Sequence, residues 1–208
     1  MLKELLKRYP QLEVCRDALA EAVSAMIDCY KSGGKILLCG NGGSCADSDH
    51  IVGELLKGFL KLRPLSDEKK AEMKANCPIV DDELLNKLQG GLPAISLPSI
   101  TALNSAFCND VDPELIYAQP LMALGTKKDI LLALSTSGNS KNVYGAVKVA
   151  KALGVKVIGL SGKMGGKLKE VSDICICVPE TETFKVQELH LPVYHYLCAA
   201  VEAHFFDK

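Results

Sequence analysis

Short apolar runs alternate with helical patterns along most of the chain. Each run is continuously apolar, which is typical of a strand in a parallel sheet that is covered on both faces. Strands that alternate with helices need crossover connections. The pattern therefore predicts a three-layer α/β sandwich, Rossmann-like, around a five-stranded parallel sheet. The predicted strands are residues 35–39, 92–96, 130–134, 156–160 and 174–178.

The longest helical patterns lie near the two ends of the chain. Residues 12–30 carry an apolar stripe with helical spacing, and residues 185–206 form the closing helix. We expect the N-terminal helix to pack against the domain or against a second subunit. Between the strands the pattern predicts helices at about 45–60, 99–107, 113–124, from 141 onwards and at 167–171, with Asn109 and Asp110 forming a polar break.

Residues 66–89 do not follow the alternation. They are dense in acidic and basic side chains, which favours a solvated helical insertion; a lid over the functional site is the other interpretation. No linker rich in Ser, Pro or Gly divides the chain, so residues 1–208 are predicted to be a single domain that carries this insertion.

The stretch after the third predicted strand is the best candidate for a ligand site. Ser135, Thr136, Ser137 and Ser140 place four hydroxyls within six residues, and Gly138 allows backbone to approach a ligand closely. A helix begins directly afterwards, and free N–H groups at a helix start favour an anion. The stretch predicts a phosphate site; the alternative is that Ser137 or Ser140 only caps the helix.

Composition narrows the classes of function. With 24 basic and 25 acidic residues and no basic run, the chain shows no electrostatic basis for binding nucleic acid or a membrane surface. No apolar stretch reaches the roughly 20 residues of a membrane span. The first residues alternate in charge and lack the apolar core of a signal peptide, which predicts a cytoplasmic protein.

The nine cysteines include no CxxC pair, and Cys175 and Cys177 are interpreted as small core residues instead of zinc ligands.

Two glycine-rich turns require a test for nucleotide binding. A dinucleotide fingerprint that starts at Gly40 fails at Cys45, where a third glycine is required. The turn at residues 162–167 continues with Leu168, where a P-loop needs Ser or Thr. The sequence therefore predicts no nucleotide, and a sugar phosphate or another small anion remains.

Two pairs of polar side chains share helix faces. His50 and Glu54 lie four residues apart, and Gln187 and His195 lie eight apart. His50 and Glu54 could be an ordinary pair on the protein surface, and His195 could be a histidine buried in the core. Spacing alone does not decide between these interpretations and an acid–base site.

Four motifs follow one another along the chain. They are Gly40-Asn-Gly-Gly-Ser44, His50-x-x-x-Glu54, Ser135-Thr-Ser-Gly-Asn-Ser140, and Gln187-Glu-x-His190 with His195. In this order they resemble the sugar isomerase (SIS) domain of phosphoheptose isomerases, and the resemblance covers nearly the whole chain. It implies isomerisation of sedoheptulose 7-phosphate to D-glycero-D-manno-heptose 7-phosphate through an enediol, a step toward nucleotide-activated heptose.

The resemblance also implies roles for particular residues. Glu54 would be the base that moves a proton between C1 and C2, and His195 would be the acid at the oxygen. Some similar proteins hold a zinc ion at positions that correspond to His50, Glu54, Gln187 and His195. Family members are tetramers, which implies a homotetramer with sites at subunit interfaces. The implied substrate contacts are Asn41, Gly42, Gly43, Ser44, Asn109, Asp110, Ser135, Thr136, Ser137, Ser140 and Gln187.

The chain departs from the family pattern in three places. Gly58 stands where the family often has Arg, Phe184 stands where an acidic residue is common, and the insertion is longer than in compact members. These departures affect the substrate's identity more than the reaction type. The alternative function is a non-catalytic SIS module that binds sugar phosphates for regulation or associates with a replication initiator; such relatives keep the serine loop but can lose the acid–base pair, which this chain keeps.

Overall fold

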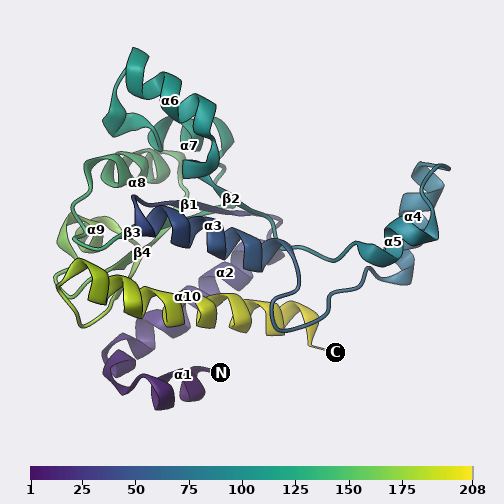
Figure 1. Ribbon diagram of the computed structural model, residues 1–208, viewed down its shortest axis with the longest axis horizontal. Helices are drawn as coiled ribbons and strands as arrows, with labels where there is room; N and C mark the ends of the chain where they lie inside the picture. Colours follow the sequence, from purple (N-terminus) through teal and green to yellow (C-terminus); the bar gives the residue numbers. More distant parts are fainter. Residues whose placement is uncertain (208) are drawn as a thin grey trace.

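The computed structural model describes residues 1–207. Five parallel strands form one sheet in the order β2-β1-β3-β4-β5 (Figure 1). Each strand lies within two residues of its predicted position, so the predicted sheet is confirmed. The strands are β1 (Ile36–Cys39), β2 (Ala94–Ser96), β3 (Ile130–Ser135), β4 (Lys156–Ser161) and β5 (Ile174–Cys177).

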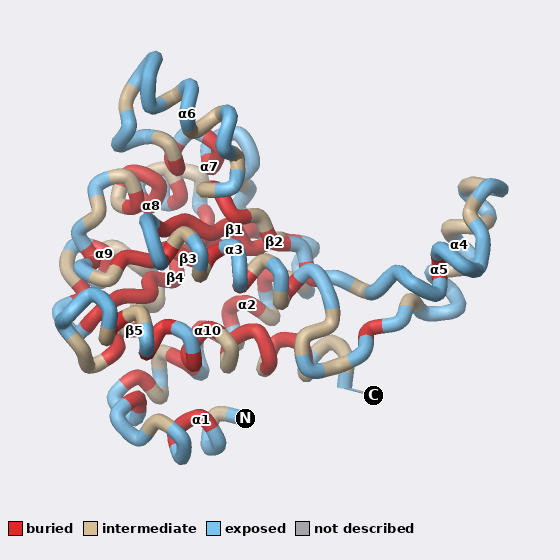
Figure 2. The backbone as a smooth tube through the Cα atoms, viewed as in Figure 1, coloured by how far each residue is buried: buried red, intermediate tan, exposed pale blue. Residues whose placement is uncertain are grey.

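Helices cover both faces of the sheet, and the strands between them are buried (Figure 2). In β3, Ile130, Leu132 and Leu134 pack on one side, while Leu131 and Ala133 pack on the other. Successive strand side chains point to opposite faces, so a strand covered on both sides is continuously apolar. One layer contains α2 (Arg16–Lys31), α3 (Gly43–Leu56) and α10 (Thr183–Phe206), and the other contains α7 (Ala118–Leu124), α8 (Lys141–Leu153) and α9 (Gly166–Val171).

Short elements connect and extend these layers. The predicted helix at 12–30 is divided, because a 3-10 helix, η1, precedes α2. None of the helices in the described part of the chain combines the length and apolar character of a membrane span. The remaining elements outside the insertion are α1 (Leu2–Arg8), η1 (Pro10–Cys15), η2 (Leu97–Ser99), α6 (Thr101–Asp110) and η3 (Pro113–Leu115).

The predicted polar break at Asn109 and Asp110 is wrong by two residues. Both residues form the last turn of α6, and the chain leaves the helix at Val111. Asp112 then accepts a hydrogen bond from the N–H of Glu114 at 2.7 Å and begins η3. The predicted helix at 113–124 is therefore two elements, η3 and α7.

The insertion at residues 66–89 contains two helices that stand away from the sheet (Figure 1). They are α4 (Asp67–Asn76) and α5 (Asp82–Lys87), capped by the side chains of Ser66 and Asp81. Of these residues, all of which the structure describes, Leu85 alone is buried. An antiparallel bridge between Pro64 and Gln89 closes its base. The helical insertion is present as predicted, and in the single chain it points away from the layers.

Candidate active site

The turn after β1 and the loop after β3 lie side by side, because β1 and β3 are neighbouring parallel strands. Asn41 exchanges two amide hydrogen bonds of 2.8 Å with Asn142, in the first turn of α8. Tyr117 donates to Asn41 Oδ1 at 3.0 Å or to the carbonyl of Gly40 at 2.7 Å. Sequence reasoning missed Asn142 and Tyr117, because no local pattern links them to a turn 76 or more residues earlier.

The hydroxyls of the serine loop, residues 135–140, are arranged around one another. The Oγ atoms of Ser135 and Ser140 lie 2.9 Å apart, and Ser137 Oγ accepts from the N–H of Asn139 at 3.2 Å. Ser140 occupies the N-cap position of α8, yet its side chain makes no capping hydrogen bond. The interpretation that Ser140 only caps the helix is therefore wrong. Its hydroxyl lies within the loop, beside the helix start.

Gly138 allows a close approach between two loops of the protein. Its φ is +68°, and a Cβ atom there would lie 1.9 Å from the carbonyl oxygen of Gly165. The carbonyl of Gly138 accepts from the N–H of Leu168 at 3.0 Å. The sequence predicted a close backbone approach at Gly138, and in this chain the second glycine turn makes a close approach there.

Gln187 lies over the start of α3. Its amide is so close to Gly43 that a Cβ atom on that glycine would meet Nε2 at 2.4 Å. Gly42 precedes it with a φ of +55°, and Ser44 is buried in the first turn of the helix. The structure therefore brings four predicted contacts together: Gly42, Gly43, Ser44 and Gln187.

Glu54 and His195 meet at His50. His50 Nε2 lies 3.1 Å from Glu54 Oε1, and the ring centroids of His50 and His195 are 5.1 Å apart. On its other side, His50 Nδ1 lies 3.0 Å from the hydroxyl of Tyr194, which donates to Asp47 Oδ1 at 3.2 Å. Which ring nitrogen of His50 is the donor depends on the tautomer, because the neutral ring carries one N–H.

The sequence did not single out Asp47 or Tyr194 as parts of this cluster. Asp47 precedes His50 by three residues, a spacing that places both on one helix face. Burial raises the pKa of the Asp47 carboxyl. Tyr194 comes from α10, and no pattern within the sequence pairs it with α3.

The cluster leaves one atom free on each predicted acid–base residue. Glu54 Oε2 and His195 Nε2 are buried and have no hydrogen-bond partner among the described residues. The Glu54 side chain is only 14% exposed, so it is not part of a mere surface pair. Burial, together with the neighbouring His50, lowers the pKa of His195 although Glu54 acts in the opposite direction. A water-excluded carboxylate oxygen beside a free imidazole nitrogen can carry out proton transfer.

Three of the predicted zinc ligands, His50, Glu54 and His195, lie near one another in the single chain, but the set of four does not form a metal site. Among residues 1–207, no three His, Cys, Asp or Glu side chains are arranged so that they could hold a metal ion. His50 and Glu54 are hydrogen-bonded to each other. Gln187 lies eight residues before His195 in α10, which is roughly 12 Å along the helix axis. The residues as arranged therefore do not fit a bound zinc ion.

Asn109 and Asp110 lie apart from this cluster. Both are exposed at the end of α6, and Asn109 donates to Asp110 Oδ1 at 2.8 Å. The helix α6 stands outside the layer formed by α7 and α8, far from α10 (Figure 1).

Near the cluster, Gly58 has no room for a side chain, because a Cβ atom would lie 2.3 Å from the carbonyl of Lys61. An arginine could not replace Gly58 on this backbone.

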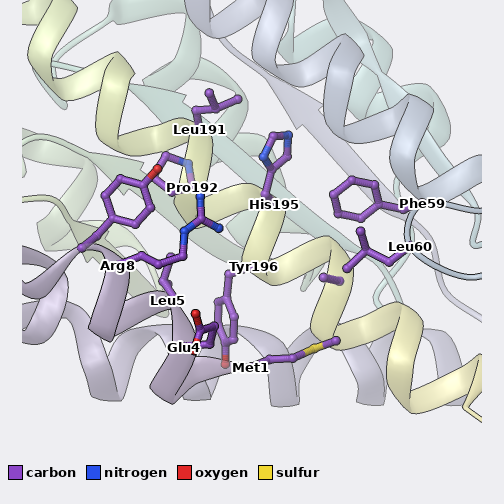
Figure 3. Close-up of a pocket in the computed structure, with 12 residues that line it drawn as sticks. Met1, Glu4, Leu5, Arg8, Phe59, Leu60, Leu191, Pro192, His195 and Tyr196 are labelled. Carbon is purple, nitrogen blue, oxygen red and sulfur yellow. The ribbon is translucent and has the colours of Figure 1, made fainter.

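A groove of about 600 Å³ opens beside His195, between α1 and α10 (Figure 3). Phe59 and Leu60 lie at one end and Arg8 lies toward the other (Figure 3). No residue of the serine loop lines the groove. The residue His195 therefore borders a mostly apolar groove that does not extend to the predicted phosphate site within this chain.

The chain is similar to known proteins over most of its length. A family model described as the SIS domain matches residues 2–91 and 89–162. The chain is 39% identical to a phosphoheptose isomerase of Helicobacter pylori (strain P12) over 206 residues, covering 99% of this chain and 93% of the relative. It is also 39% identical to a phosphoheptose isomerase of Rhodospirillum rubrum over 194 residues, covering 93% and 89%.

A solved structure agrees with this similarity. The structure of a phosphoheptose isomerase from Francisella tularensis matches with a TM-score of 0.76 and 33% identity, covering 93% of this chain and 90% of that chain. Sequence and fold thus agree over nearly the full length, and the chain belongs to the phosphoheptose isomerase family of SIS-domain proteins.

Proposed function

We propose that this protein isomerises sedoheptulose 7-phosphate to D-glycero-D-manno-heptose 7-phosphate. Its family membership supports the reaction class. The observation that carries the proposal is the meeting of Glu54 and His195 at His50, with Glu54 Oε2 and His195 Nε2 both buried and free of partners.

The reaction needs one base and one acid at adjacent carbons. Glu54 takes a proton from C1 while His195 gives a proton to the carbonyl oxygen on C2, which yields the enediol. Protonated Glu54 then returns its proton to C2, and His195 recovers a proton from the oxygen on C1, which becomes the aldehyde. Burial favours both roles, because it desolvates the carboxylate and, by lowering the pKa of His195, makes the protonated ring a stronger acid. Each transfer typically contributes about 10²–10⁴-fold in rate.

The serine loop is the proposed phosphate site. Its hydroxyls lie at the start of α8, where helix N–H groups and the helix dipole favour an anion. The amide pair of Asn41 and Asn142 connects this site to the turn after β1. Asn41, Ser44 and Gln187 are proposed to contact the sugar.

We further propose a homotetramer whose sites are completed between chains. A Cβ atom on Gly162, beside the serine loop, would lie 2.9 Å from Val186, whereas His195 lies nine residues later in α10 and so roughly 13 Å along the helix. The acid–base cluster and the serine loop of one chain are therefore separated along α10. A second chain could place its own serine loop, or its Asn109 and Asp110, nearer to the acid–base cluster of the first chain. Light scattering in solution measures the assembly.

Zinc and cellular location stay predictions. A zinc ion at His50, Glu54, Gln187 and His195 would require these side chains to rearrange, and no step above depends on one. Elemental analysis of the purified protein and assays with and without chelator test it. The cytoplasm is the proposed compartment, and cell fractionation tests it.

The decisive experiment incubates the purified protein with sedoheptulose 7-phosphate and follows heptose phosphate formation. Glu54→Gln should abolish turnover, because an amide cannot accept the carbon-bound proton. Glu21→Gln, on the exposed side of α2, is the matched control and should retain wild-type activity. A wild-type protein that leaves the sugar untouched would refute the proposal. A stable protein partner, together with no turnover of any ketose phosphate, would instead support the regulatory module.

A further inference from the structure

Arg63 is buried near the acid–base cluster, yet no step of the proposed reaction uses it. Its side chain is 0% exposed and pairs with Glu202, which is 1% exposed, at 2.8 Å between Nε and Oε1. Burying two charges is costly unless further hydrogen bonds satisfy them, and apolar residues of similar volume often stabilise a fold as well or better. Stability alone therefore does not explain why this buried ion pair is present.

The guanidinium of Arg63 binds the end of α3. It donates to the carbonyl of Leu55 at 2.7 Å from one terminal nitrogen and to the carbonyl of Glu54 at 3.1 Å from the other. Carbonyls in the last turn of a helix lack partners within the helix. Arg63 supplies those partners at the residue that carries the proposed base.

Glu202 binds the segment that leaves α3. Its two carboxylate oxygens accept from the N–H groups of Phe59 and Leu60, both at 2.8 Å. Although burial would raise the pKa of Glu202, these bonds and Arg63 hold it below its usual range. The ring of Phe59 in turn lies 5.5 Å from the ring of His195, between centroids. Glu202 follows His195 by seven residues, about two turns of α10, so both lie on the same face.

We propose that Arg63 and Glu202 are positioning residues that hold Glu54 and His195 at their working separation. This inference rests on the proposed isomerase function. Arg63 fixes the backbone of Glu54, the proposed base. Glu202 fixes Phe59, whose ring lies beside that of His195, the proposed acid. Displacing a reacting group by about 1 Å can cost on the order of 100-fold in rate. The pair therefore acts on turnover through geometry, without touching the substrate.

Two variants separate positioning from folding. Arg63→Lys keeps the charge opposite Glu202 but cannot make the forked contacts to α3. The double variant Arg63→Met with Glu202→Leu removes both charges and roughly preserves volume, so it should fold even if a single change does not. Each should lower kcat by roughly 10–100-fold, while KM for sedoheptulose 7-phosphate stays within about threefold, because the serine loop is untouched.

The matched control is an ion pair that holds other segments than the end of α3 or Phe59. Lys35 and Asp129 pair at 2.7 Å at the starts of β1 and β3, where Asp129 also accepts from the N–H groups of Lys35 and Thr126. Lys35→Met should lower the melting temperature and leave kcat unchanged. If Lys35→Met lowers kcat as much as Arg63→Lys, or if folded Arg63→Lys and the double variant both keep wild-type kcat, the positioning role is overturned.

Histidine side-chain NMR makes the test independent of turnover. Arg63→Lys should shift the ring signals of His195 and His50, whereas Lys35→Met should not. Shifted rings in a protein that does not isomerise the sugar would refute the proposed function but support the positioning contact. Unshifted rings in both Arg63 variants would refute the positioning role, even in an active enzyme.

Discussion

Replacing Gly138 with alanine tests the contact between the serine loop and the second glycine turn. Gly138 has a φ of +68°, and a Cβ atom there would lie 1.9 Å from the carbonyl oxygen of Gly165. Gly154 is the matched control, because its φ is +71° and a Cβ atom there would make only an ordinary contact, at 3.7 Å from Lys127 Cβ. Both substitutions introduce the same backbone strain, but only Gly138→Ala adds a clash with backbone.

The two variants should therefore differ in stability. A left-handed conformation costs a residue other than glycine roughly 1–2 kcal/mol, which is the expected loss for Gly154→Ala. Forcing an additional atom into a packed region adds roughly 1–3 kcal/mol, so Gly138→Ala should lose about 2–5 kcal/mol of the free energy of unfolding. Because the clash displaces the loop that carries Ser137 and Ser140, KM for the sugar phosphate should rise in Gly138→Ala alone.

Equilibrium urea denaturation measures the difference. Both variants are compared with wild type at one fixed protein concentration, because association stabilises a folded chain by mass action. A shift of the midpoint at constant m-value reports stability. Equal losses in the two variants, with an unchanged KM for Gly138→Ala, would refute the described packing of the two loops.

Two further predictions concern pH and the insertion. Burial lowers the pKa of His190 to about 4 from 6.5, so the unfolded chain takes up the proton first, and roughly 3 kcal/mol of stability present above pH 6.5 is lost as the pH falls toward 4. His190→Met should flatten the pH dependence of the free energy of unfolding in that window, and a slope equal to wild type would contradict the assignment. Replacing residues 66–88 with a short Gly-Ser linker should change the free energy of unfolding by less than about 1 kcal/mol, since Leu85 alone is buried there. A loss of several kcal/mol in urea denaturation would show that α4 and α5 stabilise the folded state through contacts outside the single chain.

The local parts of the site could be predicted because each lies within one short stretch. The serine loop follows β3 directly, so its continuous apolar run and its hydroxyls indicated a strand, a loop and a helix start. Helical spacing likewise placed His50 and Glu54 on one face. The position of Asn109 and Asp110 was not predictable in this way, because a polar pair can end a helix as readily as it can separate two helices.

Periodicity and turn chemistry act between near neighbours, so the amino-acid pattern predicted the alternation of strands and helices and the two glycine turns, and it supplied each candidate side chain. Which helices pack together followed from the folded domain. That packing brought Tyr194 and His195 of α10 to His50 of α3, and it placed the Arg63 guanidinium at the backbone carbonyl of Glu54. Such contacts join residues far apart in the chain, and they depend on the folding of the whole domain.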